Sequence, residues 1–174
     1  MVYCVAEVHL GGALVDVSDK TAVGGPGSAQ GVFVGTFIHS LDPKQRLTIP
    51  SEWRDYVGSP SSLYVLPGVE DRYLTVFPAR EMVQRLQRLR NLSIADAKAR
   101  QFARVLGSQS QLAPWDSAGR VRIKDDLLAF AGLTDQVVLI GAIEGFELWN
   151  MERWKAVGSA GAANLRDAAL YVGF

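Results

Sequence analysis

Two short stretches of the chain share one pattern and decide the fold: "LDPKQRLTI" at residues 41–49 and "WDSAGRVRI" at residues 115–123. In both, an Asp precedes a tight turn, an Arg follows four positions after that Asp, and polar residues then alternate with apolar ones. An Asp carboxylate accepts hydrogen bonds from backbone amides two or three residues further on, so each Asp favours a turn that leads into a half-buried strand. The same structural unit is therefore predicted twice.

The segments around the two turns recur in the same order: an extended segment, the turn, a strand, a short helix and two more strands. The helices are predicted at 51–57 and 125–131. Pro50 suits the first helical position of one, while Gly58 and Gly132 suit left-handed caps at the two helix ends. Period-two alternation predicts that the strands after the turns direct four apolar side chains inward: Leu47, Ile49, Val121 and Ile123.

These patterns predict an α+β fold built from two tandem repeats. The predicted parts are an extension at 1–31, a first repeat at 33–79, a helical connector at 80–107, a second repeat at 108–154 and a tail at 155–174. The connector is basic, and its helical face is expected first to be a solvated surface; the basic residues of that face are Arg85, Arg88, Arg100 and Arg104. The tryptophans are expected to be core or interface aromatics, because they sit at equivalent element ends: Trp53, Trp115, Trp149 and Trp154.

Composition excludes several classes of protein. The chain has 174 residues, no net charge, one Cys and two His, so no disulfide framework and no zinc spacing can be recognised. The longest apolar run, at 137–143, is too short to span a bilayer, and the first residues lack the charged start of a secretory signal. We expect a cytoplasmic protein without cofactor, metal or membrane partner.

The turns place cationic side chains on one surface. Alternation puts Arg120 and Arg122 on the solvent side of their strand, and Lys44 and Arg46 extend that set in the first repeat. Guanidinium groups donate in a fork that fits phosphate oxygens or the O6 and N7 atoms of guanine, so this surface is suited to duplex DNA. The simpler interpretation is that each Arg only pairs with the Asp four residues before it, and for a single Arg the spacing favours that interpretation.

The sequence also resembles a known family. The two D-x-x-x-R turns, "IHSLDPKQRLTIP" with "FVGTF" before it, "VVLIGAIEGFELWNMERW" and the helical insert are similar to those of the MraZ family. The resemblance implies two swapped-hairpin β-barrel repeats of the AbrB/SpoVT type. It implies a cytoplasmic, nucleoid-associated transcription factor that forms homo-oligomeric rings and binds direct repeats in double-stranded DNA upstream of its own division and cell-wall gene cluster.

The resemblance assigns roles to particular residues. Lys44, Arg46 and Arg120 match the DNA-facing segment of that family, and strand alternation adds Arg122 to the candidate DNA-binding set. The turn-forming residues are Asp42, Asp116 and Gly119.

The chain departs from the family pattern at two turn positions and at its start. Gln45 stands where Gly is usual, so the first turn is expected either to differ or to carry strain of about 1 kcal/mol. Ala118 stands where Lys is common. Val32 matches the usual initiator Met, which suggests a start codon at Val32 with 1–31 absent from the native protein; a true extension is the alternative.

Three other functions fit parts of the pattern. Asp42 and Asp116 could form a paired-carboxylate enzyme site, but no catalytic His, Cys or metal set accompanies them, so we expect no enzyme. A structural ring that does not bind DNA is the second. An AbrB-type regulator or antitoxin is the third, although such proteins are typically single-copy and the internal repeat argues against it.

Overall fold

The computed structural model describes residues 31–58, 61–90, 96–163 and 165–173. The predicted extension, apart from Gly31, lies outside the described residues. The predicted start at Val32 concerns the residues that precede it, so the described residues do not test it. The helices and strands below belong to the described ranges.

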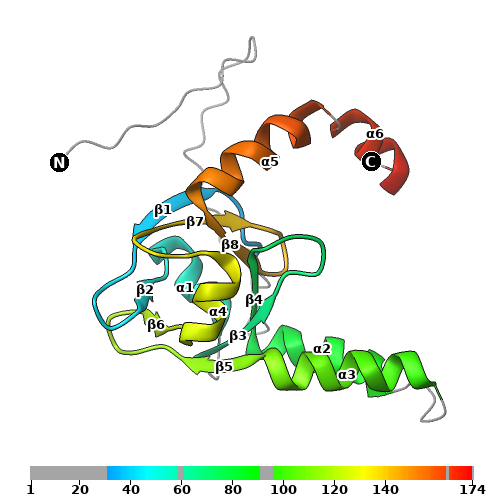
Figure 1. Ribbon diagram of the computed structural model, residues 1–174, viewed down its shortest axis with the longest axis horizontal. Helices are drawn as coiled ribbons and strands as arrows, with labels where there is room; N and C mark the ends of the chain where they lie inside the picture. Colours follow the sequence, from blue (N-terminus) through cyan, green and yellow to red (C-terminus); the bar gives the residue numbers. More distant parts are fainter. Residues whose placement is uncertain (1–30, 59–60, 91–95, 164, 174) are drawn as a thin grey trace, which may run out of the picture.

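The strands form one six-stranded antiparallel sheet and one two-stranded sheet. The larger sheet has the order β1-β7-β8-β4-β3-β5 (Figure 1). Its strands are β1 (Thr36–Ser40), β3 (Ser62–Pro67), β4 (Leu74–Pro78), β5 (Gln111–Pro114), β7 (Gln136–Gly141) and β8 (Phe146–Asn150). The smaller sheet pairs β2 (Arg46–Thr48) with β6 (Arg120–Arg122). With several short helices beside them, these antiparallel sheets confirm the predicted α+β class.

The two repeats exchange their first strands. β1 of the first repeat pairs with β7 of the second, and β5 of the second repeat pairs with β3 of the first. The repeats also meet at the centre of the sheet, where β4 pairs with β8. Each repeat therefore completes the sheet of the other, and most of the core belongs to both.

The strands after the turns bury the side chains that the alternation predicts. Leu47 is fully buried, and Ile49, Val121 and Ile123 are each at most 2% exposed. Leu47 and Val121 lie opposite each other in the β2–β6 pair, so both point from this small sheet into the common core. The opposite face of β2 and β6 is left to polar side chains.

The two short helices begin and end where the sequence predicts. α1 spans Ser51–Val57 and α4 spans Asp125–Ala131. The cap details differ from the prediction in two respects. Pro50 is the N-cap residue of α1 rather than its first helical residue, because its ψ of 138° is still extended. Gly132 has the expected left-handed conformation, but Gly58 combines a positive φ with a ψ of −159°, which turns the chain in another direction.

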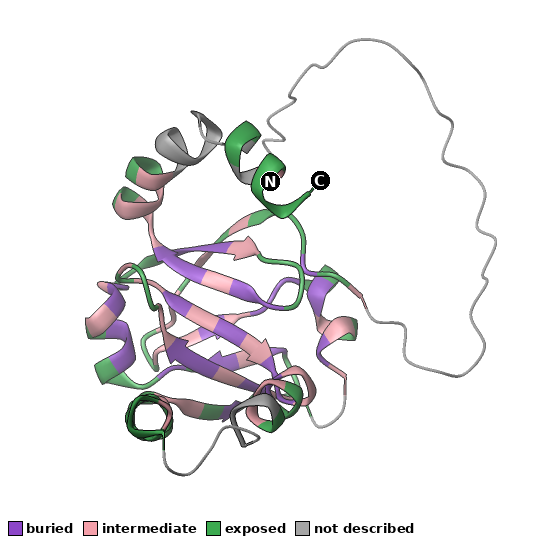
Figure 2. Ribbon diagram, turned by 90° about the vertical axis from the view of Figure 1, so that its right-hand side faces the viewer, coloured by how far each residue is buried: buried purple, intermediate pink, exposed green. Residues whose placement is uncertain are grey.

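An aromatic cluster fills the core beneath α1. Trp53 is 1% exposed, and its ring lies 5.7 Å from that of Phe33, 4.9 Å from Phe37 and 5.0 Å from Phe146. Its indole N–H donates to the carbonyl of Val34 at 3.0 Å, so the buried polar atom is satisfied. Figure 2 shows buried residues concentrated along the sheet and on the inner sides of the short helices.

The other helices extend from two separate sides of the sheet (Figure 1). α2 (Ala79–Arg90) and α3 (Ala97–Gln109) lie together, and α2 packs on β3 and β4. α5 (Met151–Ala163) packs on β7 and β8 and leads into α6 (Leu165–Val172). The expectation of core aromatics holds for the buried Trp53 and Trp149, whereas Trp115 and Trp154 are half-buried. Among the described helices, none has the length and apolar character that crossing a bilayer requires.

Candidate functional site

The turn of the first repeat is held by the carboxylate of Asp42. Its Oδ1 accepts from the backbone amides of Lys44 at 2.8 Å and Arg46 at 2.9 Å. Its Oδ2 accepts from the Arg46 guanidinium, through Nε at 2.7 Å and Nη2 at 2.6 Å. The Asp therefore shapes the turn and fixes the Arg side chain at the same time.

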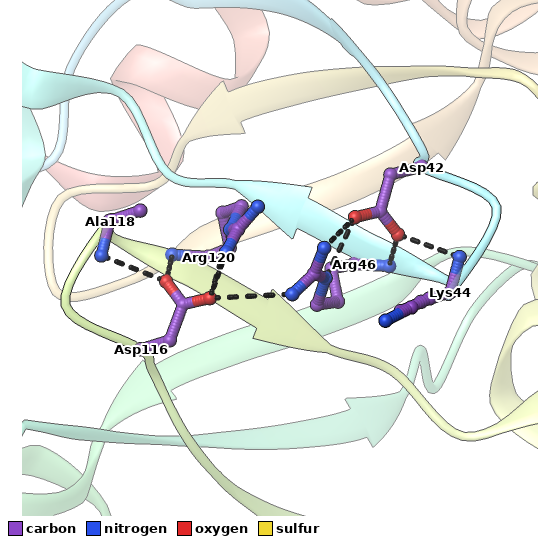
Figure 3. Close-up of polar contacts among 6 residues, drawn as sticks. All are labelled: Asp42, Lys44, Arg46, Asp116, Ala118 and Arg120. Carbon is purple, nitrogen blue, oxygen red and sulfur yellow. Dashed lines mark hydrogen bonds and ion pairs between the residues drawn. The ribbon is translucent and has the colours of Figure 1, made fainter.

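The turn of the second repeat has the same set of bonds. Asp116 Oδ1 accepts from the amides of Ala118 at 2.9 Å and Arg120 at 3.0 Å. Its Oδ2 accepts from Arg120 Nε at 2.8 Å and Nη2 at 2.7 Å. Figure 3 shows both turns side by side, with the Arg46 guanidinium between the two carboxylates; its Nη1 lies 3.7 Å from Asp116 Oδ2.

The fourth position of each turn has a positive φ, because its carbonyl must reach the other repeat. Gly119 has a φ of 73°, and its carbonyl accepts from the amide of Ile49 at 2.9 Å. Gln45 has a φ of 59°, and its carbonyl accepts from the amide of Ile123 at 3.1 Å. Of the two outcomes expected for Gln45, the turn keeps the conformation of its partner, and the residue carries the strain of a non-glycine with positive φ.

Four polar side chains share the outer face of the β2–β6 pair. In the register, Arg46 lies opposite Arg122 and Thr48 lies opposite Arg120. Directly opposed residues of an antiparallel pair point to the same side, so these four form one surface, called here the β2–β6 face. The side chains of Arg46, Arg120 and Arg122 are 27%, 35% and 62% exposed. Lys44 is exposed in the turn beside this face.

The electrostatics of the turns keep both aspartates ionised. Hydrogen bonds from the Arg46 side chain and backbone lower the pKa of Asp42 to about 2. The side-chain hydrogen bond from Arg120 likewise lowers the pKa of Asp116, and the same bond raises the pKa of Arg120. A paired-carboxylate acid/base site needs one carboxyl with a raised pKa, so these two turns have the opposite character.

The Asp–Arg pair leaves part of each guanidinium available. A guanidinium has five N–H groups. Asp42 engages Nε and Nη2 of Arg46, and the remaining Nη1 lies 3.7 Å from Asp116 Oδ2, too far for a hydrogen bond. The Asp pairing predicted by the simpler interpretation is thus present, and it also fixes the plane of each guanidinium. Both interpretations of the Arg residues are compatible with this geometry.

One contact of the site is not predicted by the sequence. Arg122 Nη2 donates to the side-chain Oε1 of Gln45 at 3.2 Å, and it lies 3.8 Å from Asp125 Oδ1. The only signal in the sequence is the departure from Gly at position 45, which predicts a backbone cost but does not identify a partner for the side chain. The described residues contain no cluster of His, Cys, Asp and Glu that could hold a metal ion.

A duplicated α+β unit with exchanged strands and one arginine-bearing face defines the class of this molecule. A family model described as "MraZ protein, putative antitoxin-like" matches residues 109–169. Proteins named "Transcriptional regulator MraZ" are similar over most of the chain. The one from Corynebacterium jeikeium is 37% identical over 123 residues, which cover 71% of this chain and 84% of that protein. The one from Finegoldia magna is 30% identical over 138 residues, covering 79% of this chain and 94% of that protein.

The chain therefore belongs to the MraZ family of transcriptional regulators. The resemblance noted in the sequence is confirmed. The family is not one of enzymes, so the prediction that this chain is no enzyme is confirmed as well.

Proposed function

We propose that this protein is a sequence-specific DNA-binding transcription factor that acts as a ring-shaped homo-oligomer on direct repeats upstream of its own division and cell-wall gene cluster. DNA contact is assigned to Lys44, Arg46, Arg120 and Arg122. The observation that carries the proposal is the β2–β6 face, which gathers three Arg residues over a buried Leu47–Val121 pair. The exchange of β1 and β5 supports the swapped-hairpin fold of the AbrB type, and a cytoplasmic, nucleoid-associated location follows from the function.

The fixed guanidinium groups favour directed hydrogen bonds to bases over non-directional electrostatic attraction to DNA. An Arg held by a carboxylate has lost its rotamer freedom before it meets DNA, so less entropy is lost on binding. Its free N–H groups can donate to phosphate or to the major-groove edge of guanine.

A single face binds DNA weakly. The β2–β6 face and the turns beside it carry four cationic side chains and the two carboxylates of Asp42 and Asp116. One chain can therefore neutralise few phosphates. A ring that presents several faces to tandem repeats gains by effective concentration, by about a hundredfold or more. Assembly is therefore part of the proposed mechanism.

Two separate apolar surfaces support a ring. A groove of about 650 Å³ lies between the β3–β4 hairpin and the α2–α3 pair, and Phe102 and Val105 line it while 50% and 45% exposed. On α6, Leu170 and Tyr171 are 69% and 92% exposed. Figure 1 places α6 and the α2–α3 pair on different sides of the molecule. Two different surfaces suit a head-to-tail contact between copies, and such contacts generate a ring when the rotation from copy to copy closes.

Assembly can be tested by complementation between two variants. We expect Phe102→Asp and Tyr171→Asp each to reduce the mass measured by light scattering to that of one chain. A mixture of the two should form a dimer, because each variant keeps the surface that the other has lost. An unchanged mass for both variants would contradict this assembly.

DNA binding is tested by a mobility-shift assay on the DNA upstream of the protein's own gene at two salt concentrations. Arg46→Ala and Arg120→Ala should each weaken binding at least about tenfold, because each removes a major-groove donor. Lys155→Ala is the control, since Lys155 is also a cationic side chain and is exposed, but it lies on α5. Binding that is unchanged in both Arg variants would refute the assignment, and no wild-type shift at low salt would favour a ring that does not bind DNA.

A further inference from the structure

The two ends of the β2–β6 face carry different side chains although their backbones match. The first turn contributes Lys44 and Gln45 where the second contributes Ala118 and Gly119. Arg122, from the second repeat, lies opposite Arg46 and so beside the first turn. Its counterpart in the first repeat is Thr48, beside the second turn. The first-turn end is therefore richer in donors.

More of the available positive charge lies at the first-turn end than at the second-turn end. Arg46 and Arg120 are both paired with the carboxylates of their own turns. Lys44 has no ion pair within the described ranges, and Arg122 has only the 3.8 Å approach of the exposed Asp125. The charge that no turn carboxylate neutralises thus belongs to Lys44 and Arg122 at the first-turn end, and to Arg54, whose guanidinium lies beside Gly119, at the second-turn end.

Gln45 connects these two observations. Its positive φ is unfavourable for a residue with a side chain, and Gly at this position would relieve it. The side chain nevertheless makes a contact that Gly cannot make, because its Oε1 accepts from Arg122 Nη2 at 3.2 Å. A similar residue in the second turn would require Arg54 to move, since a Cβ on Gly119 would lie 2.5 Å from Arg54 Nε.

We propose that the face binds each DNA repeat in one fixed direction, with the first-turn end as its dominant contact, and that Gln45 positions Arg122 for it. This rests on the proposed function of the β2–β6 face. A face with two equal ends would bind a repeat equally well in both directions. The unequal ends select one, because Arg122 and Lys44 find their base and phosphate partners in one orientation only.

The role of Gln45 is tested by separating stability from DNA affinity. Gln45→Gly should leave the melting temperature unchanged or higher, because it relieves the positive φ. The same change should lower DNA affinity about fivefold, because Arg122 loses its support. In an Arg122→Ala background, Gln45→Gly should have no further effect on affinity. An affinity that Gln45→Gly leaves unchanged, or lowers equally in both backgrounds, would overturn the positioning role.

The direction of binding is tested by DNA cleavage from tethered iron–EDTA. The full chain carries Cys4→Ser, which removes its one cysteine, and either Pro43→Cys or Ser117→Cys, which are exposed and equivalent in the two turns. The two probes should cut at opposite sides of each repeat. Equal cutting on both sides by each probe would overturn the inference while leaving DNA binding intact. No binding by the wild-type chain would instead overturn the proposed function, and this inference with it.

Discussion

The two turns of the molecule have the same backbone bonds and different outward side chains. In both, one Asp accepts from two backbone amides and from the Arg four residues on. In both, the carbonyl at the positive-φ position accepts from the other repeat. Exposed residues differ, such as Lys44 against Ala118, and so does the positive-φ position, which is Gln45 in one turn and the buried Gly119 in the other. Duplication has kept the backbone bonds that join the repeats, because Ile49–Gly119 and Ile123–Gln45 are equivalent, whereas the side-chain contact between Gln45 and Arg122 has no counterpart.

The interior shows the same contrast at a larger scale. Trp53 of α1 and Leu127 of α4 occupy equivalent positions, and both are buried, at 1% and 5% exposure. Trp53 makes ring contacts with Phe33, Phe37 and Phe146. The first repeat therefore supplies the large side chain for a core that both repeats share.

The largest expected effect comes from removing that side chain. Trp53→Ala should lower the free energy of unfolding by about 4 kcal/mol, since it empties a closely packed aromatic cluster and leaves the Val34 carbonyl without its donor. Leu127→Ala should cost about 3 kcal/mol. Urea denaturation followed by circular dichroism measures both.

The comparison of the two core positions has its own control. Trp53→Phe keeps most of the ring volume, so its cost should be clearly smaller than that of Trp53→Ala. If Trp53→Ala cost less than Leu127→Ala, the first repeat would not be the main source of the shared core.

The second effect concerns the positive-φ residue of the second turn. Gly119→Ala should cost about 2 kcal/mol, because Ala disfavours a φ of 73° and its Cβ would approach Arg54 Nε at 2.5 Å. In an Arg54→Ala background the cost should fall to about 1 kcal/mol, the strain alone. Gln45→Ala should change stability little, since position 45 already carries a Cβ. Equal losses of stability in Gly119→Ala and Gln45→Ala would contradict this difference between the two turns.

Local features of the fold were within reach of the sequence, and pairing between the repeats was not. The bounds of α1 and α4 and the inward residues such as Leu47 and Val121 follow from caps and alternation, which are properties of neighbouring residues. Pairing of β1 with β7 leaves the same pattern of burial along β1 as pairing with β3 would, so periodicity cannot distinguish them.

The site was predictable to the same degree. The Asp42–Arg46 and Asp116–Arg120 pairs are local, and their spacing in the sequence predicts them. The contact between Gln45 and Arg122 joins residues far apart in the chain, and it exists because β2 lies against β6 in one register. The unusual Gln at position 45 could not be matched to Arg122 from the sequence without knowledge of that register.

The smallest expected effect is the pH dependence of the turns. The pKa of Asp42 is about 2 in the folded protein, against 3.8 for an unperturbed Asp, and that of Asp116 is also lowered. A carboxyl with a lowered folded pKa stabilises the fold fully above its unfolded pKa and loses that contribution as pH falls toward the folded value. The urea midpoint should therefore decrease between pH 3.8 and about 2. Asp42→Asn should flatten this decrease, whereas Asp55→Asn, an exposed change outside the turns, should not. The effect is small because both turns are open to solvent, and an equal slope in all three proteins would mean that the turn carboxylates contribute nothing to it.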